Sequence, residues 1–179
     1  MRKHVVLILM IFTIFISANA VDCVFAAENG TDIQTVSKGG VVLKFPSTWC
    51  VAKSTSNTSV VAIASIDSIG LNKVAAVTIN VERKPIEGSF DDFIENNYAS
   101  IEKDESFNLS SSGAVAFGDM QGKEYTYISN MNGTVKEHRA IWIDHDDEAY
   151  VILYSAPIDQ FNSNLKVFDY VIKNIQINA

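Results

Sequence analysis

The chain has 179 residues, of which 47% are hydrophobic, and it carries 14 Lys and Arg against 21 Asp and Glu, for a formal net charge of −7 at pH 7. This acidic balance argues against binding to nucleic acid or to anionic lipid surfaces, because both favour a basic protein footprint. The length is enough for one ordinary domain with its own hydrophobic core.

The N-terminal segment has the three parts of a secretory signal. Arg2 and Lys3 precede an apolar run over residues 5–16, and the small residues at 17–20 offer a cleavage site, with a second one after Ala26. The alternative is an uncleaved N-terminal anchor, which would be the only membrane contact, although the run is shorter than the roughly 20 apolar residues of a spanning helix. We therefore expect a secreted or extracytoplasmic protein, divided into a signal peptide (1–26), a flexible N-terminal extension (27–37) and a single domain (38–179).

Hydrophobic periodicity beyond the signal predicts three strands, a helix, four strands and a second helix. The first helix begins after Ser89, a good N-cap, and runs to about Lys103. Residues 149–156 are apolar at consecutive positions, which predicts a central strand covered on both faces. The predicted strands are 41–45, 60–66 and 77–81, then 107–116, 123–129, 135–144 and 149–156, and the second helix covers about 159–175.

The two cysteines lead to a conditional prediction. If the signal is cleaved after Ala20, Cys23 survives and can form a disulfide with Cys50 in an oxidising compartment. If cleavage follows Ala26, Cys50 is alone and is then best interpreted as a small buried hydrophobic residue.

Sequons of the form Asn-x-Ser/Thr are more frequent than chance would give. They occur at Asn29, Asn57, Asn108 and Asn132, and the last three are candidate glycosylation sites in an exported domain. Asn57 lies in a polar stretch that predicts an exposed loop. Asn132 with Gly133 also has a structural interpretation as a tight hairpin turn.

The acidic cluster Asp144, Asp146, Asp147 and Glu148 is the candidate metal site. Hard cations such as calcium prefer several oxygen ligands, and these carboxylates surround a predicted turn. The spacing lacks the glycine and the distant glutamate of an EF-hand, so a solvated, charged hairpin tip is the competing interpretation.

Catalytic motifs are absent from the sequence, which contains no Gly-x-Ser-x-Gly, no His-Glu-x-x-His and no phosphate-binding glycine loop. Beyond the signal there are only His138, which is expected to face solvent from its strand, and His145. We therefore expect no enzymatic activity and no cofactor.

Aromatic residues at strand spacing give a further candidate surface. Tyr125 and Tyr127 share one strand face, and Trp142, Tyr150 and Tyr154 could line a neighbouring face as a recognition surface. The competing interpretation is that aromatics at this spacing form core beneath the helices.

The segment Gly40-x-x-x-x-Phe45-Pro46-x-x-Trp49, together with the order of predicted elements, resembles the PsbP-like family, which has the PsbP/Mog-type fold. The resemblance covers about residues 36–177. It implies an α+β fold in which an antiparallel sheet is sandwiched between helices (α/β/α, order βββ-α-ββββ-α). It also gives structural roles to Gly40 at a strand entry, Phe45 in the core, Pro46 at a turn and Trp49 as a packing anchor.

What this resemblance implies about function is limited. The best-known members are extrinsic, lumenal subunits that help photosystem II retain calcium and chloride, and relatives are exported proteins or lipoproteins of prokaryotes with no assigned role. No metal-binding residue of those subunits has a match in this chain. We expect a non-catalytic accessory or binding module at the cell envelope with an envelope protein as partner. The alternatives are a calcium-binding protein that uses residues 144–148 and, third, an extracytoplasmic hydrolase.

Overall fold

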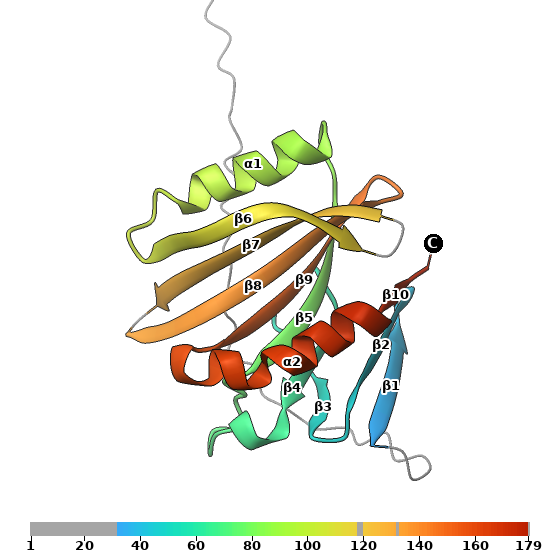
Figure 1. Cartoon of the computed structure of the whole chain (residues 1–179), viewed down its shortest axis with the longest axis vertical. Helices are drawn as coiled ribbons and strands as arrows, with labels where there is room; N and C mark the ends of the chain where they lie inside the picture. The colour runs from blue at the N-terminus through green and yellow to red at the C-terminus, as the bar shows by residue number, and fades with distance from the viewer. Residues whose placement is uncertain (1–31, 118–119, 132, 179) are drawn as a thin grey trace, which may run out of the picture.

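A computed structural model describes residues 32–117, 120–131 and 133–178, and it contains an antiparallel β-sheet with two long helices (Figure 1). The elements before the first long helix are β1 (Ile33–Lys38), β2 (Val41–Pro46), β3 (Trp49–Ala52), β4 (Ser59–Ser65), the 3-10 helix η1 (Ile66–Ser68) and β5 (Thr78–Pro85). The remaining ones are α1 (Phe90–Ile101), β6 (Phe107–Phe117), β7 (Met120–Met131), β8 (Thr134–His145), β9 (Glu148–Pro157), α2 (Ile158–Asn174) and β10 (Gln176–Ile177).

The strands of the described residues form two antiparallel sheets. The larger has seven strands in the order β3-β4-β5-β9-β8-β7-β6, and the smaller has three in the order β1-β2-β10. Strand β9 is central in the larger sheet and buried along nearly all of its length, which confirms the prediction made from its consecutive apolar residues. Strands β3 and β6 are the two edges.

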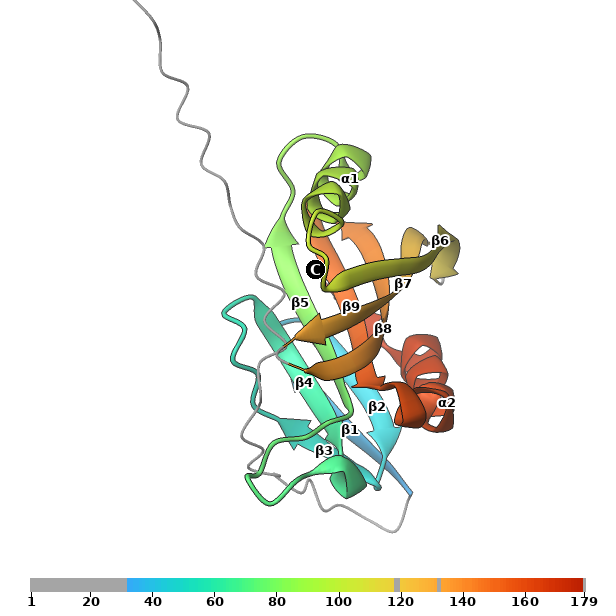
Figure 2. The same cartoon turned by 90° about the vertical axis from the view of Figure 1, so that its left-hand side faces the viewer.

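The two long helices pack on opposite faces of the larger sheet (Figure 2). Neighbouring residues of strand β8 contact different helices, because successive side chains of a strand point to opposite faces. Trp142 packs with the α1 residues Ile94 and Tyr98, whereas Ile141 packs in the core with the α2 residue Phe168. The larger core extends from α2 to the buried face of β2.

Local sequence explains where the helices begin and end. The Ser89 hydroxyl accepts a hydrogen bond from the backbone N–H of Asp92 at 3.1 Å, so α1 starts at the predicted cap. Helix α2 follows Pro157 directly, and Phe161, Phe168 and Val171 form its buried stripe. Both predicted helices are therefore confirmed.

The predicted number of strands before α1 is wrong, because five strands precede it in the described residues from 32 onward rather than three. Strand β1 covers residues 33–37 of the segment expected to be a flexible extension (27–37); its side chains are at most half-buried, so it has little hydrophobic signal and is held by pairing with β2. Strand β3 is only four residues long, and its adjacent Trp49 and Cys50 are both buried, which obscures the alternation. After α1 the four predicted strands are all present, and the two-residue β10 follows α2.

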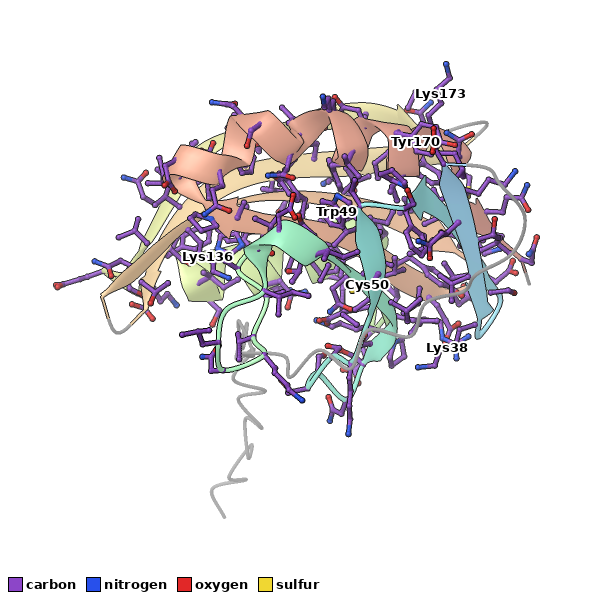
Figure 3. The ribbon with its side chains drawn as sticks, turned by 90° about the horizontal axis from the view of Figure 1, so that it is seen from below. Lys38, Trp49, Cys50, Lys136, Tyr170 and Lys173 are labelled. Atoms are coloured by element: carbon purple, nitrogen blue, oxygen red, sulfur yellow. The ribbon has the colours of Figure 1, made fainter. Side chains whose placement is uncertain are left out.

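The residues that carry the resemblance to the PsbP-like family have structural roles. Gly40 has a φ angle of +83°, and a Cβ there would come within 2.6 Å of the carbonyl oxygen of Asn178. Phe45 and Trp49 are buried in the larger core. Figure 3 shows Trp49 and Cys50 on the same strand; Trp49 packs in the core beneath α2, while Cys50 belongs to a small cluster on the other face.

The remaining sequence predictions about cysteine and the membrane concern the N-terminal segment. Cys50 is buried, and no described cysteine is free. Cys23 and the signal segment 1–26 lie outside the described residues, so the Cys23–Cys50 disulfide stays a prediction. In the part of the chain that is described, neither helix is both long and apolar enough to cross a membrane.

Candidate functional site

The acidic cluster forms the tip of the β8–β9 hairpin. Asp146 and Asp147 are its two loop residues, with φ angles of 53° and 60°, the backbone of a tight hairpin turn. Asp144 pairs across the strands with Ala149, and Glu148 pairs with His145, so the side chains of Asp144 and Glu148 project to opposite faces. Among the described residues no three His, Cys, Asp or Glu side chains are grouped to hold a metal ion.

Among the described residues, two close contacts between polar side chains involve members of this hairpin. Arg83 on β5 contacts Glu148 at 3.4 Å, and the Nε2 atom of His145 lies 3.5 Å from a carboxylate oxygen of Asp146. Both pairs are partly exposed, and such pairs contribute little stability. The geometry is that of a charged turn, and it adds no support to the calcium hypothesis.

His138 is fully buried, so the expectation that it faces solvent is wrong. Its Nε2 atom lies 2.9 Å from the Ser129 hydroxyl and its Nδ1 atom 2.8 Å from the Ser155 hydroxyl. Its ring stacks on Tyr127 with centroids 4.6 Å apart. Burial, together with the positive charge of Lys136, lowers the pKa of His138 to about 3.

This Ser-His-Ser arrangement differs from a catalytic triad. A triad needs a third group, normally a carboxylate, that orients the histidine and stabilises its charged form. Here both ring nitrogens are satisfied by hydroxyls, and the pKa of about 3 keeps the ring neutral at physiological pH. The arrangement therefore links β7, β8 and β9 through a neutral imidazole.

Lys136 connects β8 to the segment that precedes β5. Its ammonium donates a hydrogen bond to the carbonyl oxygen of Ala76 at 3.0 Å, joining β8 to the segment before β5 (Figure 3). Burial lowers the pKa of this lysine. The hydrogen bond from this buried ammonium to a loop carbonyl gives Lys136 a structural role.

The aromatic residues form core on both faces, not one recognition surface. Tyr127 and Trp142 lie beneath α1, where the Trp142 indole N–H donates to the Tyr98 hydroxyl at 3.0 Å, and Tyr98 stacks on the half-buried Tyr125 at 3.7 Å. Tyr150 and Tyr154 point to the other face and pack in the larger core with α2. The core interpretation is confirmed, and the idea of a shared aromatic surface is wrong because adjacent strand positions alternate between faces.

A polar network on the α1 face of β4 and β5 was not predicted. Glu82 accepts hydrogen bonds from the Thr58 hydroxyl at 2.7 Å and from the Asn80 amide at 2.9 Å, and Lys84 lies 3.3 Å from the same carboxylate. The side chains of Glu82 and Lys84 are only 14% exposed. The signal in the sequence is the period of two in Thr78, Asn80, Glu82 and Lys84, which places four polar side chains on one face of a strand.

The predicted glycosylation sites fall on different parts of the surface. Asn57 is exposed beside a small pocket of about 300 Å³ that is also lined by Lys38 and Arg83. Asn108 is exposed on β6. Asn132 lies outside the described residues, although its neighbour Gly133 has the positive φ of 79° expected in the predicted hairpin turn.

Strand β6 forms a largely exposed edge of the larger sheet. In the described part of the chain it pairs with β7 on one side only, and its eleven residues include no charged side chain and no proline. Residues 110–114 are all exposed, and the register with β7 shifts between Leu109 and Ser111, which marks a β-bulge. Sequence reasoning predicted a weak strand here but could not predict that it is an edge, because edge position depends on the pairing of all the other strands.

Comparisons with known proteins identify a fold and no close relative. No family model matches the sequence, and no curated protein matches it. Among solved structures, the cyanobacterial PsbP (CyanoP) from Synechocystis matches with a TM-score of 0.58 at 14% identity, covering 86% of this chain and 98% of that one. LpqN of Mycobacterium tuberculosis, described as involved in cell envelope biogenesis, matches with a TM-score of 0.59 at 13% identity over 83% and 93% of the two chains.

A protein of unknown function from Pseudomonas aeruginosa matches with a TM-score of 0.52 at 12% identity, over 80% of this chain and 96% of the other. At identities this low, likeness between structures establishes the fold alone. The chain therefore has a PsbP-like fold, as its Gly/Phe-Pro/Trp segment indicates.

Proposed function

We propose that this chain is an exported accessory module of the cell envelope that binds another protein and has no catalytic role of its own. The observation that carries the proposal is the exposed, uncharged edge of β6. An edge strand presents a row of backbone donors and acceptors that another chain can use, and most soluble proteins protect such edges with charges or proline.

The location of the protein outside the cytoplasm is supported by the signal-like N-terminal sequence and by the likeness to CyanoP and LpqN. The absence of catalysis is supported by His138, since a buried, neutral imidazole between two hydroxyls is a poor general base at physiological pH.

The test is native mass spectrometry of the protein extracted gently, without chelators, from the envelope of its own cells. The proposal predicts a defined complex that is heavier by one other protein. A monomer that carries a stoichiometric divalent metal would replace this function with calcium binding, and a bare monomer would contradict the accessory role.

A further inference from the structure

The free edge of β6 can accept a strand over a limited length. The bulge near Ser110 interrupts its pairing geometry, so the regular part runs from Ser111 to Phe117. The first four residues of that stretch, 111–114, are small and exposed, and Val115 is half-buried. Small, uncharged side chains leave the backbone accessible to a strand of about seven residues.

The surface next to this edge is acidic on one face. Helix α1 has no basic residue, and Asp91, Glu95 and Glu102 share one side of it at spacings of four and seven. Asp91 contacts Lys123 of β7, the neighbour of β6, at 3.0 Å. The pKa of Tyr125 on β7 is raised by burial first, while Lys123 opposes the shift and the charges of these three acids add to it.

The charge excess above this edge remains after the Lys123 pair is counted. Asp91 and Glu95 both lie close enough to influence Lys123, and Glu102 lies close enough to influence Tyr125 on the same strand. Lys103, which follows Glu102, is the other lysine near this group of acids, so three carboxylates are set against two lysines. Figure 1 shows α1 running alongside β6. A strand added to β6 would therefore lie beside negative potential on the α1 face.

We propose that β6 is extended by a strand from a partner protein, and that this strand carries Lys or Arg on the face it turns toward α1. This inference rests on the proposed function and names the binding mode and the chemistry of the partner. Backbone hydrogen bonds give such an interface its affinity, and the alternate side chains give it its specificity.

A second copy of this chain is the less favoured occupant. Antiparallel pairing of two β6 strands around a two-fold axis would place both α1 helices on the same face of the joined sheet. Their acidic sides would then approach each other, and like charges at an interface oppose association. A strand that carries Lys or Arg would instead be attracted to the acidic side of α1.

The test uses defined peptide probes and the folded, signal-cleaved chain labelled with ¹⁵N. The first probe is Lys-Val-Lys-Thr-Lys-Val-Lys. The second replaces every lysine with glutamate, and the third is Lys-Pro-Lys-Thr-Lys-Pro-Lys, which has the charge of the first but lacks two backbone donors needed for strand pairing. We expect the first peptide alone to perturb the amide signals of residues 111–117.

Charge variants test the role of α1. Glu95→Lys should lower the affinity for the first peptide about threefold at low salt, which is the scale of one exposed charge interaction. The matched control is Asp67→Lys, which reverses another exposed acid, on η1, and should leave the affinity unchanged.

Backbone variants test the role of the edge. Successive N–H groups of a strand point to opposite sides, so of Ser111→Pro and Ser112→Pro one removes a donor that faces β7 and the other removes a donor of the free edge. The variant that keeps its thermal stability is the edge variant. Its affinity for the first peptide should fall at least tenfold.

Three results would overturn the inference. Equal binding of the proline-containing peptide would mean attraction by charge alone, shifts confined to other residues would place the site elsewhere, and dimerisation of the protein through β6 would make a second copy the occupant. If no peptide binds but a complex with another protein is still recovered from the envelope, this binding mode is rejected and the proposed function stands. If the first peptide binds as expected but no complex is recovered, the proposed function is rejected.

Discussion

The buried His138 makes folding stability depend on pH in a defined window. Burial lowers the pKa of the folded-state imidazole to about 3, while the unfolded-state pKa is close to the reference value of about 6.5. Between these values the unfolded chain binds one proton more than the folded chain, so stability falls as pH decreases. The contribution is complete above pH 6.5 and is lost progressively toward pH 3.

The magnitude follows from the same two values. At pH 5 the histidine is almost fully protonated in the unfolded state and neutral in the folded state. This difference lowers the free energy of unfolding by about 2 kcal/mol relative to pH 7.5. This figure changes little if the folded-state pKa lies anywhere below about 4. It is a large fraction of the stability of a typical small domain, about 5–15 kcal/mol.

The assay is urea unfolding of the wild-type protein and of His138→Gln at pH 7.5 and pH 5. The variant lacks the titrating ring and should be less stable at pH 7.5, but its stability should fall about 2 kcal/mol less than that of the wild type when the pH is lowered. Phe168→Leu is the matched control, since it weakens the core without removing a titratable group and should keep the full pH dependence. An unchanged pH dependence in His138→Gln would refute the reasoning.

Three further substitutions test the structural account. Gly40→Ala should destabilise the fold by at least about 2 kcal/mol in urea unfolding, because its Cβ meets the Asn178 carbonyl oxygen at a positive φ; an unchanged midpoint would contradict the described backbone. Asp147→Gly should raise the melting temperature slightly, by the equivalent of about 0.5 kcal/mol, since the second residue of this hairpin turn favours glycine; a large loss would indicate that the carboxylate is needed. Trp142→Phe should cost about 1–3 kcal/mol because the buried Tyr98 hydroxyl loses its donor, and a neutral result in thermal unfolding would mean that the bond adds nothing.

Much of the fold could be predicted because its signals are local. The cap at Ser89, the buried stripe of α2 and the apolar run of β9 each depend on a few neighbouring residues, and all are confirmed. The missed strands lack such signals, since β1 has no fully buried side chain and is defined by its pairing with β2.

The candidate site was harder to predict because burial and edge position are properties of the whole sheet. His138 and Arg139 are both polar neighbours in one strand, yet the first is buried between Ser129 and Ser155 and the second pairs with Glu124 and Asp169 on the opposite face. Which of the two is buried depends on which face α1 covers. The exposure of β6 likewise follows from the strand order and from no feature of its own sequence.

The central claim is that the β6 edge binds another protein in the envelope. The most direct measurement places a photo-crosslinking amino acid at Ser112 of the full chain in its own cells, with the same substitution at the exposed Lys166 of α2 as control. The account predicts one crosslinked partner from position 112 and none from position 166. Crosslinking of Ser112 to a second copy of the chain, or equal products from both positions, would contradict it.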